Sequence, residues 1–389
     1  MFSRITTAVI CISSLCLSSQ RSFAQLDPGP GPVDGRVNVI STAVPFLRIS
    51  PDARSGAMGD AGVAISPDAN SVYWNLSKLP FAKKKTSVAV TYTPWLKELV
   101  SDVFLAQLAG YTQIDENQSI GGSLRYFSLG DIEFRNNNGQ FDGNFRPREF
   151  AIDGGYARKL SPNWSIGVTA RYIHSSLASG TINDQTIRPG RSIAADLSAF
   201  YTKDIEKDNG VMNNFSAGIA ITNIGNRISY TQSAQKDFLP TNLGLGAAYM
   251  IGIDEYNKVT FTADINKLMV PSVQYVGDSA YLPNKSMLEG MFSSFGDAPN
   301  GFKEELQELM YSVGAEYMYN ELFAVRAGYY NEHATKGNRK YFTAGVGVKY
   351  NIFGLNFSYL VPSGTGIQRN PLSNTLRFSL TFDLGANEE

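Results

Sequence analysis

From residue 86 to the end of the chain, apolar residues alternate with polar or small residues in 14 separate stretches. A repeat of two residues is the pattern of a β-strand with one apolar face and one polar face. One face of the last stretch carries Leu376, Phe378, Leu380, Phe382 and Leu384. The stretches lie near 86–93, 102–114, 118–128, 149–158, 164–176, 191–203, 211–223, 240–252, 257–267, 311–319, 322–331, 340–350, 353–361 and 374–384. This pattern predicts an all-β fold.

Two all-β architectures compete for this pattern. A soluble sandwich or propeller buries the apolar face of each strand, whereas an outer-membrane barrel turns that face toward lipid and the polar face toward the lumen. Most stretches contain about 9–13 residues, the length that a tilted strand needs to cross a bilayer, while soluble strands usually contain about 5–6. The even number of stretches is also expected of bacterial barrels. Both features favour the barrel.

The connections between the stretches alternate in length. The short ones are 115–117, 159–163, 204–210, 253–256, 320–321 and 351–352, and the longer ones are 94–101, 129–148, 177–190, 224–239, 268–310, 332–339 and 362–373. Short periplasmic turns opposite long outside loops are typical of outer-membrane barrels. We therefore predict a 14-stranded antiparallel transmembrane outer-membrane β-barrel over 86–389, with a long outside loop at 268–310 and both chain ends in the periplasm.

Residues 1–24 have the layout of a cleaved secretory signal peptide. Arg4 precedes an apolar stretch over 8–17, and small residues at 22–24 provide the cleavage site. The apolar stretch is too short to span a bilayer as an anchor. Both cysteines, Cys11 and Cys16, lie in this segment, so disulfides, thiol catalysis and Cys-ligated metals are not expected in the mature chain.

The amino-acid composition limits which binding partners and which protein classes are expected. The chain carries 34 Lys and Arg residues against 35 Asp and Glu residues, which gives no reason to expect a nucleic-acid partner. The mean hydropathy is −0.16, and no mature segment has 18 consecutive apolar residues, so a helical membrane protein is excluded. Outer-membrane lipid and lipopolysaccharide are the expected surroundings of the barrel. No cofactor and no metal are expected.

Strand parity predicts which charged side chains face the lumen. The two signs are balanced, with Arg125, Arg171, Arg326, Lys349 and Arg377 against Asp153, Asp196, Asp264, Glu316 and Asp383. One interpretation is a polar conduit for a charged solute. The favoured interpretation is a lattice of ion pairs that fills a narrow or plugged barrel, because unpaired charge would be costly there.

Residues 25–85 are predicted to form a linker and a periplasmic hatch or plug. A turn-rich tract at 27–35 precedes a segment with small residues and mixed patterning. Its glycines lack the strand–loop–helix context of a phosphate loop. We expect Gly56, Gly59 and Gly62 to pack closely against the barrel wall, and Trp74 and Asn75 to anchor a turn.

The long outside loops are the candidates for partner binding. The loop at 268–310 gathers Met287, Leu288, Met291, Phe292 and Phe295, and residues 301–311 are expected to form a short amphipathic helix. Met and Phe supply adaptable apolar contacts. The loop at 129–148 mixes Phe134, Phe141 and Phe145 with arginines, a composition enriched at interfaces. The alternative for residues 285–296 is that they fold back and plug the barrel mouth, and the alternative for the loop at 129–148 is packing of the loop on itself.

Two resemblances follow from these segments. Residues 53–80, followed by the strand pattern, resemble the FadL type of hatch-and-barrel long-chain fatty acid transporters. In that family an Asn-Pro-Ala turn follows an aromatic-Trp pair, and here Tyr73-Trp74-Asn75 is followed by Leu76-Ser77. The closer resemblance, carried by 38–64, 68–81, 87–102 and 285–312, is to the PorV (LptO) family of the type IX secretion system.

The PorV resemblance implies a non-enzymatic role. Such proteins bind the C-terminal signal domain of exported cargo at the translocon barrel (SprA/Sov-like) and shuttle it to the surface attachment and signal-peptidase complex (PorU-like). The first alternative is FadL-like transport of fatty acids or other hydrophobic solutes. The second is a surface glycolipid (lipopolysaccharide) deacylase that would pair His174 with Ser175 or Ser176. No HExxH or GxSxG motif supports an enzyme.

Overall fold

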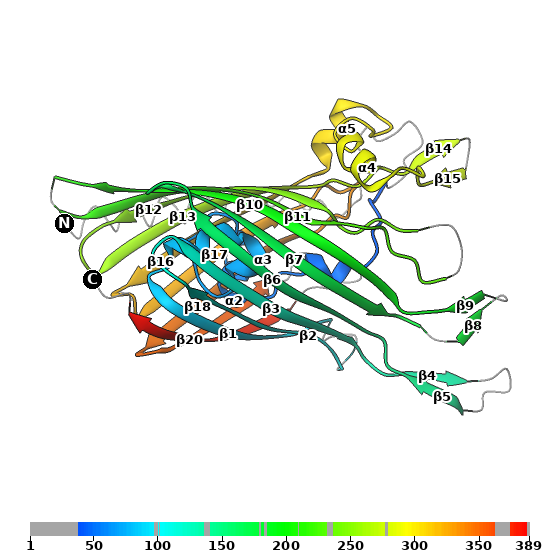
Figure 1. Ribbon diagram of the computed structural model, residues 1–389, viewed down its shortest axis with the longest axis horizontal. Coiled ribbons are helices and arrows are strands. Elements are labelled where there is room, and N and C mark those ends of the chain that lie inside the picture. Colours follow the sequence, from blue (N-terminus) through cyan, green and yellow to red (C-terminus); the bar gives the residue numbers. More distant parts are fainter. Residues whose placement is uncertain are drawn as a thin grey trace, which may run out of the picture.

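A closed antiparallel barrel dominates the computed structural model, which describes residues 38–96, 100, 102–135, 141–178, 180–182, 185–208, 210–231, 236–276, 279–361 and 374–386. Within these residues fourteen strands form the barrel, and β1 pairs with β20 to close it (Figure 1). Its strands are β1 (Lys84–Pro94), β2 (Val103–Gln113), β3 (Gln118–Leu129), β6 (Arg148–Lys159), β7 (Trp164–Ser176), β10 (Gly190–Glu206), β11 (Met212–Gly225), β12 (Asn242–Gly252), β13 (Asn257–Leu268), β16 (Leu309–Tyr319), β17 (Phe323–Asn331), β18 (Lys340–Tyr350), β19 (Phe353–Val361) and β20 (Leu376–Ala386).

The apolar face of the sheet points outward. In β20, Phe378 and Leu380 are 41% and 38% exposed, whereas their neighbours Arg377 and Ser379 are 3% and 1% exposed. A sandwich or propeller would bury the apolar residues instead. The prediction of a 14-stranded outer-membrane barrel is therefore confirmed.

Short turns join the strands at one end of the barrel, and the long loops lie at the other end. Three small hairpins and two helices project beyond the long-loop end in Figure 1. They are β4 (Ile132–Arg135) with β5 (Phe141–Phe145), β8 (Gly180–Ile182) with β9 (Gln185–Ile187), β14 (Gln274–Val276) with β15 (Ser279–Tyr281), α4 (Met287–Ser293) and α5 (Phe302–Gln307). The hairpins were not predicted from the sequence. No helix among the described residues is long and apolar enough to cross a bilayer.

Residues 38–82 occupy the inside of the barrel as a plug. It contains four short helices, namely η1 (Pro45–Arg48), α2 (Ala53–Gly56), α3 (Ser71–Trp74) and η2 (Leu76–Phe81). Asp52 caps α2, since its Oδ2 accepts the N–H of Ser55 at 2.8 Å. Leu76 and Leu79 of η2 pack with Ala89 of the barrel wall. The plug thus has a core that it shares with the barrel.

The plug runs along the whole lumen. Asn38 donates a hydrogen bond to Glu304 of the long outside loop at 3.0 Å, whereas Ala82 leads into β1 at the short-turn end. Both ends of the chain were predicted to share the short-turn side. Asn38, the first described residue, lies at the long-loop end, but residues 1–37 and 387–389 lie outside the described residues, so the position of the two chain ends stays a prediction. The predicted signal peptide, residues 1–24, lies outside the described residues, and the division at residue 85 stays a prediction.

Candidate functional site

Hydrogen bonds from the barrel wall hold the plug in place. The carboxylate of Asp264 in β13 accepts the N–H groups of Gly62 and Val63 at 2.7 and 2.9 Å. In the plug, Arg54 donates two hydrogen bonds to Glu316 of β16, at 3.2 and 3.1 Å. Both acidic side chains come from inward positions of the strands. The wall therefore supplies acceptors for the buried N–H groups of Gly62 and Val63, and adds Glu316 to the acceptors that Ser66 and Asp68 of the plug already offer Arg54.

The predicted glycines of the plug lie at close contacts. Gly59 has a φ of 70°, and a Cβ there would lie 2.5 Å from the carbonyl oxygen of Tyr329 in β17. A Cβ on Gly56 would lie 2.3 Å from Nη1 of Arg377 in β20. Gly62 differs from the prediction, because a Cβ there would lie 2.1 Å from Trp74 of the plug itself. The α-carbon of Gly62 thus packs against Trp74 within the plug, while its N–H contacts the wall at Asp264.

Trp74 and Asn75 lie at the turn between α3 and η2. The indole N–H of Trp74 donates to Oδ1 of Asp52 at 2.7 Å. The amide of Asn75 donates to the carbonyl oxygens of Val63 and Ala199, both at 3.2 Å. Ala199 belongs to β10, so Asn75 connects the plug with the wall. The anchoring role of both residues stays a prediction.

Ion pairs fill the lumen between the strands. Nine of the ten predicted inward charges take part in them: Arg171–Asp153 at 2.6 Å, Arg171–Asp196 at 2.8 Å, Arg125–Asp153 at 3.4 Å, Arg326–Glu316 at 2.6 Å, Arg377 with Asp60 of the plug at 3.0 Å, and Lys349–Asp383 at 2.6 Å. The tenth, Asp264, accepts the plug N–H groups. This arrangement favours the lattice over a sign-biased conduit.

The long outside loop at 268–310 rests on a buried cluster of charges. Glu304, Glu305 and Glu308, from α5 and its C-terminal end, are buried. Glu305 and Glu308 pair with Lys267 at the end of β13, at 3.0 and 2.6 Å. Glu304 and Glu308 pair with Lys336 of the 332–339 loop, at 2.6 and 3.0 Å. We call these five residues the charge cluster. It ties the loop to two places on the barrel rim.

The charge cluster also sets the ionisation of Glu304. Burial raises the pKa of Glu304, but the hydrogen bonds from Lys336 and Asn300 outweigh burial and hold this pKa below its ordinary value of 4.5. The side chain therefore stays ionised at neutral pH. An ionised carboxylate between two donors resists displacement from the rim, because its departure would leave Lys336 without one of its partners.

The outward side of the loop is apolar. Phe302 and Leu306 of α5 and Leu288 and Phe292 of α4 are 76%, 49%, 56% and 71% exposed, and Phe295 nearby is 47% exposed. We call these five residues the apolar surface. An amphipathic helix was predicted over 301–311. The helix α5 covers only Phe302–Gln307 of that range, because β16 begins at Leu309, and its acidic side is buried while its apolar side is exposed. The acidic side of α5 is the buried one because it pairs with Lys267 and Lys336 beneath the helix.

The predicted partner residues of this loop differ in exposure. Leu288, Phe292 and Phe295 belong to the apolar surface, Met287 is half-buried, and Met291 is buried at 5%. Phe295 also covers Nζ of Lys267, which lies 5.6 Å from its ring centroid. The side chain of Met291 therefore supports the loop and is not available to a partner.

The second predicted loop lies elsewhere on the rim. Phe141 is 61% exposed and Phe145 is half-buried, while the side chain of Phe134 lies outside the described residues. Six strands separate the β4–β5 hairpin from α4 and α5 in the barrel order. The structure therefore does not bring the two predicted groups together. Their roles as partner contacts stay predictions.

Sequence reasoning missed the charge cluster. Lys267 has the parity of the outward-facing Ile265, so the alternation assigns it to the lipid face. It is buried because the loop folds over the end of β13. A signal was present in the spacing of Glu304, Glu305 and Glu308, which places acids on one side of a helix. Its partners, however, come from distant parts of the chain.

The histidine of the enzyme alternative has a structural contact. The ring of His174 stacks on Phe150, with ring centroids 4.9 Å apart. The neighbouring Ser175 turns inward, and its hydroxyl donates to Glu149 at 2.6 Å. His174 and Ser175 thus point to opposite faces of β7. Among the described residues, no group of His, Cys, Asp and Glu side chains could hold a metal ion.

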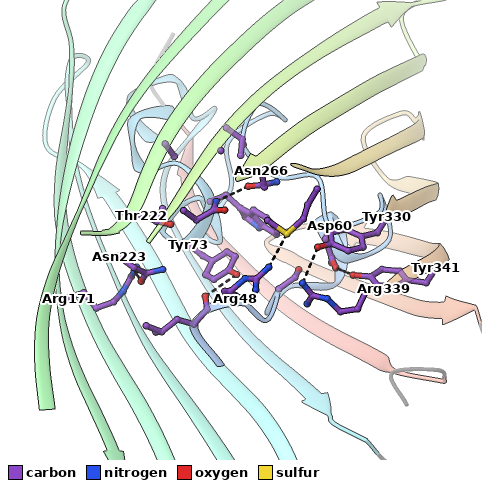
Figure 2. Close-up of a pocket in the computed structure, with 18 residues that line it drawn as sticks. Arg48, Asp60, Tyr73, Arg171, Thr222, Asn223, Asn266, Tyr330, Arg339 and Tyr341 are labelled. Carbon is purple, nitrogen blue, oxygen red and sulfur yellow. Dashed lines mark hydrogen bonds between the residues drawn. The ribbon is translucent and has the colours of Figure 1, made fainter. Parts of the chain in front are cut away.

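The described residues line several cavities inside the barrel and at its rim. One of about 430 Å³ lies at the short-turn end, between the plug and residues such as Lys258, Glu321 and Lys349. Two smaller ones, of about 100 and 220 Å³, lie between the plug and the long-loop end. Figure 2 shows the smaller of these two, with Arg48 at its centre.

Comparisons with known proteins agree with this architecture. A family model described as "Type IX secretion system protein PorV" matches residues 33–275. No curated protein matches the chain. The Pseudomonas putida toluene transporter TodX is 13% identical with a TM-score of 0.51, over 86% of this chain and 99% of that chain. A Pseudomonas aeruginosa FadL homologue is 9% identical with a TM-score of 0.43, over 89% and 99%. The TodX similarity shows the fold alone.

Proposed function

The chain belongs to the PorV family of type IX secretion system proteins, and from this premise we propose that it binds the C-terminal signal domain of exported cargo at the translocon and carries it to the surface attachment complex. Family membership gives the chain an outer-membrane role in this secretion system. The cargo step and the named partners, the translocon barrel and the attachment complex, belong to the proposal.

The apolar surface on α4 and α5 is the observation that carries the proposal. Exposed apolar patches on folded proteins mark sites of interaction. Phe302, at 76% exposure, lies on α5, whose opposite side is fixed by the charge cluster, and Phe292, at 71% exposure, lies on α4, whose opposite side is buried at Gly290 and Met291. Such a surface offers aromatic anchors on a rigid support, and binding then requires little ordering of the loop.

The location of this surface fits a folded protein domain as its occupant. It lies at the long-loop end of the barrel, beside the ends of the strands (Figure 1). Exported cargo emerges at that side if the short turns are periplasmic, as expected for this class of barrel. Flexible contacts with Leu288 and Phe295 at the edge of the patch suit cargo domains that differ in sequence.

A capture experiment tests the proposal. The double variant Leu288→Ser/Phe292→Ser should lose co-purification of secreted proteins that retain their C-terminal domains, in pull-downs from detergent extracts. Tyr350→Ser is the matched control, because Tyr350 is 79% exposed but ends β18 at the short-turn end. It should capture cargo as the wild type does.

Two results would count against the proposal. Cargo that co-purifies equally with the double variant would remove the role of the apolar surface. Uptake of a hydrophobic solute that depends on the barrel and is independent of cargo would favour the transporter alternative. Retention of the heat-dependent mobility shift in gels shows in each case that the barrel is assembled.

A further inference from the structure

Arg48 occupies a fixed place inside the lumen. It is the last residue of η1, whose Phe46 and Leu47 are buried. Phe46 stacks on Phe127 of β3 with ring centroids 6.3 Å apart. The guanidinium of Arg125 donates to the carbonyl oxygen of Leu47 at 3.3 Å. The backbone of η1 is therefore held by the wall, and the side chain of Arg48 lines both of the smaller cavities.

Arg48 is poorly compensated by the groups around it. Its Nη2 donates to the sulfur of Met310 at 2.9 Å and lies 3.8 Å from the carboxylate of Glu332. A thioether sulfur is a weak acceptor. Glu332 is already engaged, because Arg339 donates two hydrogen bonds to it at 2.7 and 2.9 Å. Two guanidinium groups therefore share one carboxylate.

The other acids that line these cavities have partners of their own. Asp60 pairs with Arg377 at 3.0 Å and accepts the hydroxyl of Tyr341 at 2.6 Å. Glu308 belongs to the charge cluster, with Lys267 and Lys336. Among the described lining residues, positive charge is thus in excess at Arg48. Burying a charged group without a matching partner is unfavourable unless something else neutralises it.

The neighbourhood has the chemistry that an anion requires. Arg339 lies beside Arg48 in Figure 2, and its Nη2 also donates to the hydroxyl of Tyr330 at 3.3 Å. A guanidinium presents several N–H donors in a planar fork, which matches the oxygens of a phosphate or carboxylate group. Cavities of about 100 and 220 Å³ exceed the roughly 30 Å³ that one water occupies in the liquid.

We propose that Arg48 and Arg339, which line both of the smaller cavities, form a binding site for a compact oxyanion, a phosphate or carboxylate group. The occupant supplies the negative charge that the lining residues lack. The same chemistry is offered by a free anion and by the head group of an anionic lipid. The site lies between the plug and the long-loop end, and nothing in the cargo proposal depends on it.

Calorimetric titration of the full chain in a non-ionic detergent tests the site. The two probes are inorganic phosphate and dodecyl phosphate. Arg48→Met should weaken binding of the probe by about tenfold or more, as expected for the loss of charged hydrogen bonds. Arg48→Lys keeps the charge without the fork and should give an intermediate affinity. Arg146→Met, which removes an exposed partner of Asp131, should bind as the wild type does.

The outcomes separate the two sources of the anion. Binding of inorganic phosphate that is as tight as that of dodecyl phosphate identifies a free anion. Much tighter binding of dodecyl phosphate, still dependent on Arg48, identifies a lipid head group. The proposal is overturned if neither probe binds the wild type, or if Arg48→Met binds both probes unchanged. The thermal midpoint of each variant without phosphate shows that the fold is retained.

Discussion

Nζ of Lys267 lies 2.6 Å from Oε2 of Glu308, and the two side chains are only 6% and 0% exposed. The pair joins the end of β13 to the start of β16 beneath α5. This ion pair attaches the loop that carries the exposed apolar surface to the membrane-embedded barrel. The position of the apolar surface therefore depends on the charge of Lys267, a residue that strand parity assigns to the lipid face.

Removal of Lys267 should loosen the loop and leave the barrel intact. Lys267→Met leaves Glu305 and Glu308 with fewer partners, and loss of one member of a buried pair costs about 3–5 kcal/mol. We expect faster cleavage by an added protease within 285–308, measured by mass spectrometry. Lys258→Met is the control, because Lys258 pairs with the exposed Glu321. Equal cleavage of both variants would argue against the charge cluster as the support.

Close packing between plug and wall should make Gly328 sensitive to substitution. A Cβ on Gly328 of β17 would lie 2.1 Å from the carbonyl carbon of Met58. Gly328→Ala should lower stability by about 1–3 kcal/mol, as overpacking does, and should raise ion conductance in planar bilayers. Gly154→Ala is matched to it, since nothing lies within 4 Å of a Cβ there. Identical unfolding midpoints would contradict this contact.

Acid should remove the stabilisation that Glu321 provides. Hydrogen bonds from two lysines, Lys258 with the larger effect and Lys83 with the smaller, lower the pKa of Glu321 from 4.5 to about 2. Because the folded pKa is the lower one, the stabilisation is complete above pH about 4.5 and is lost as the pH falls toward about 2. Glu321 is 52% exposed, so screening limits the effect to about 0.2–1 kcal/mol.

The measurement for Glu321 is a difference of urea midpoints. At pH about 7 the wild type should unfold at a higher urea concentration than Glu321→Gln does. At pH about 2 the two midpoints should coincide. Glu255→Gln, in the exposed turn before β13, is the comparison and should show a smaller difference. A gap between the wild type and Glu321→Gln that widens on acidification would refute the assignment.

Substitution of His174 should leave lipid A unchanged. Its ring contributes an aromatic contact with Phe150, worth about 0.5–1.5 kcal/mol, and faces away from the hydroxyl of Ser175. Mass spectrometry of lipid A from cells with His174→Ala or Ser175→Ala should give the wild-type acyl pattern. Retained acyl chains in the His174→Ala strain, with secretion intact, would revive the deacylase alternative.

The barrel could be predicted because lipid imposes one rule on every strand. Residues such as Phe378 and Leu380 must be apolar along a whole stretch, so the alternation is long and regular. The loops obey no such rule. The small hairpins and the buried position of Lys267 depend on contacts between distant segments, which a period of two does not encode. The inversion of α5 has the same origin, because lysines at 267 and 336 decide which side of the helix is covered.

The path of the plug has a consequence for assembly. Its first described residue, Asn38, lies beside Glu304, and its other end continues as β1, which pairs with β20 from Lys84 opposite Ala386 to Tyr92 opposite Phe378. Bulky groups such as Trp74 would have to be threaded through a finished ring if that seam joined first. We therefore expect the first and last strands to pair only after the plug segment is already in place.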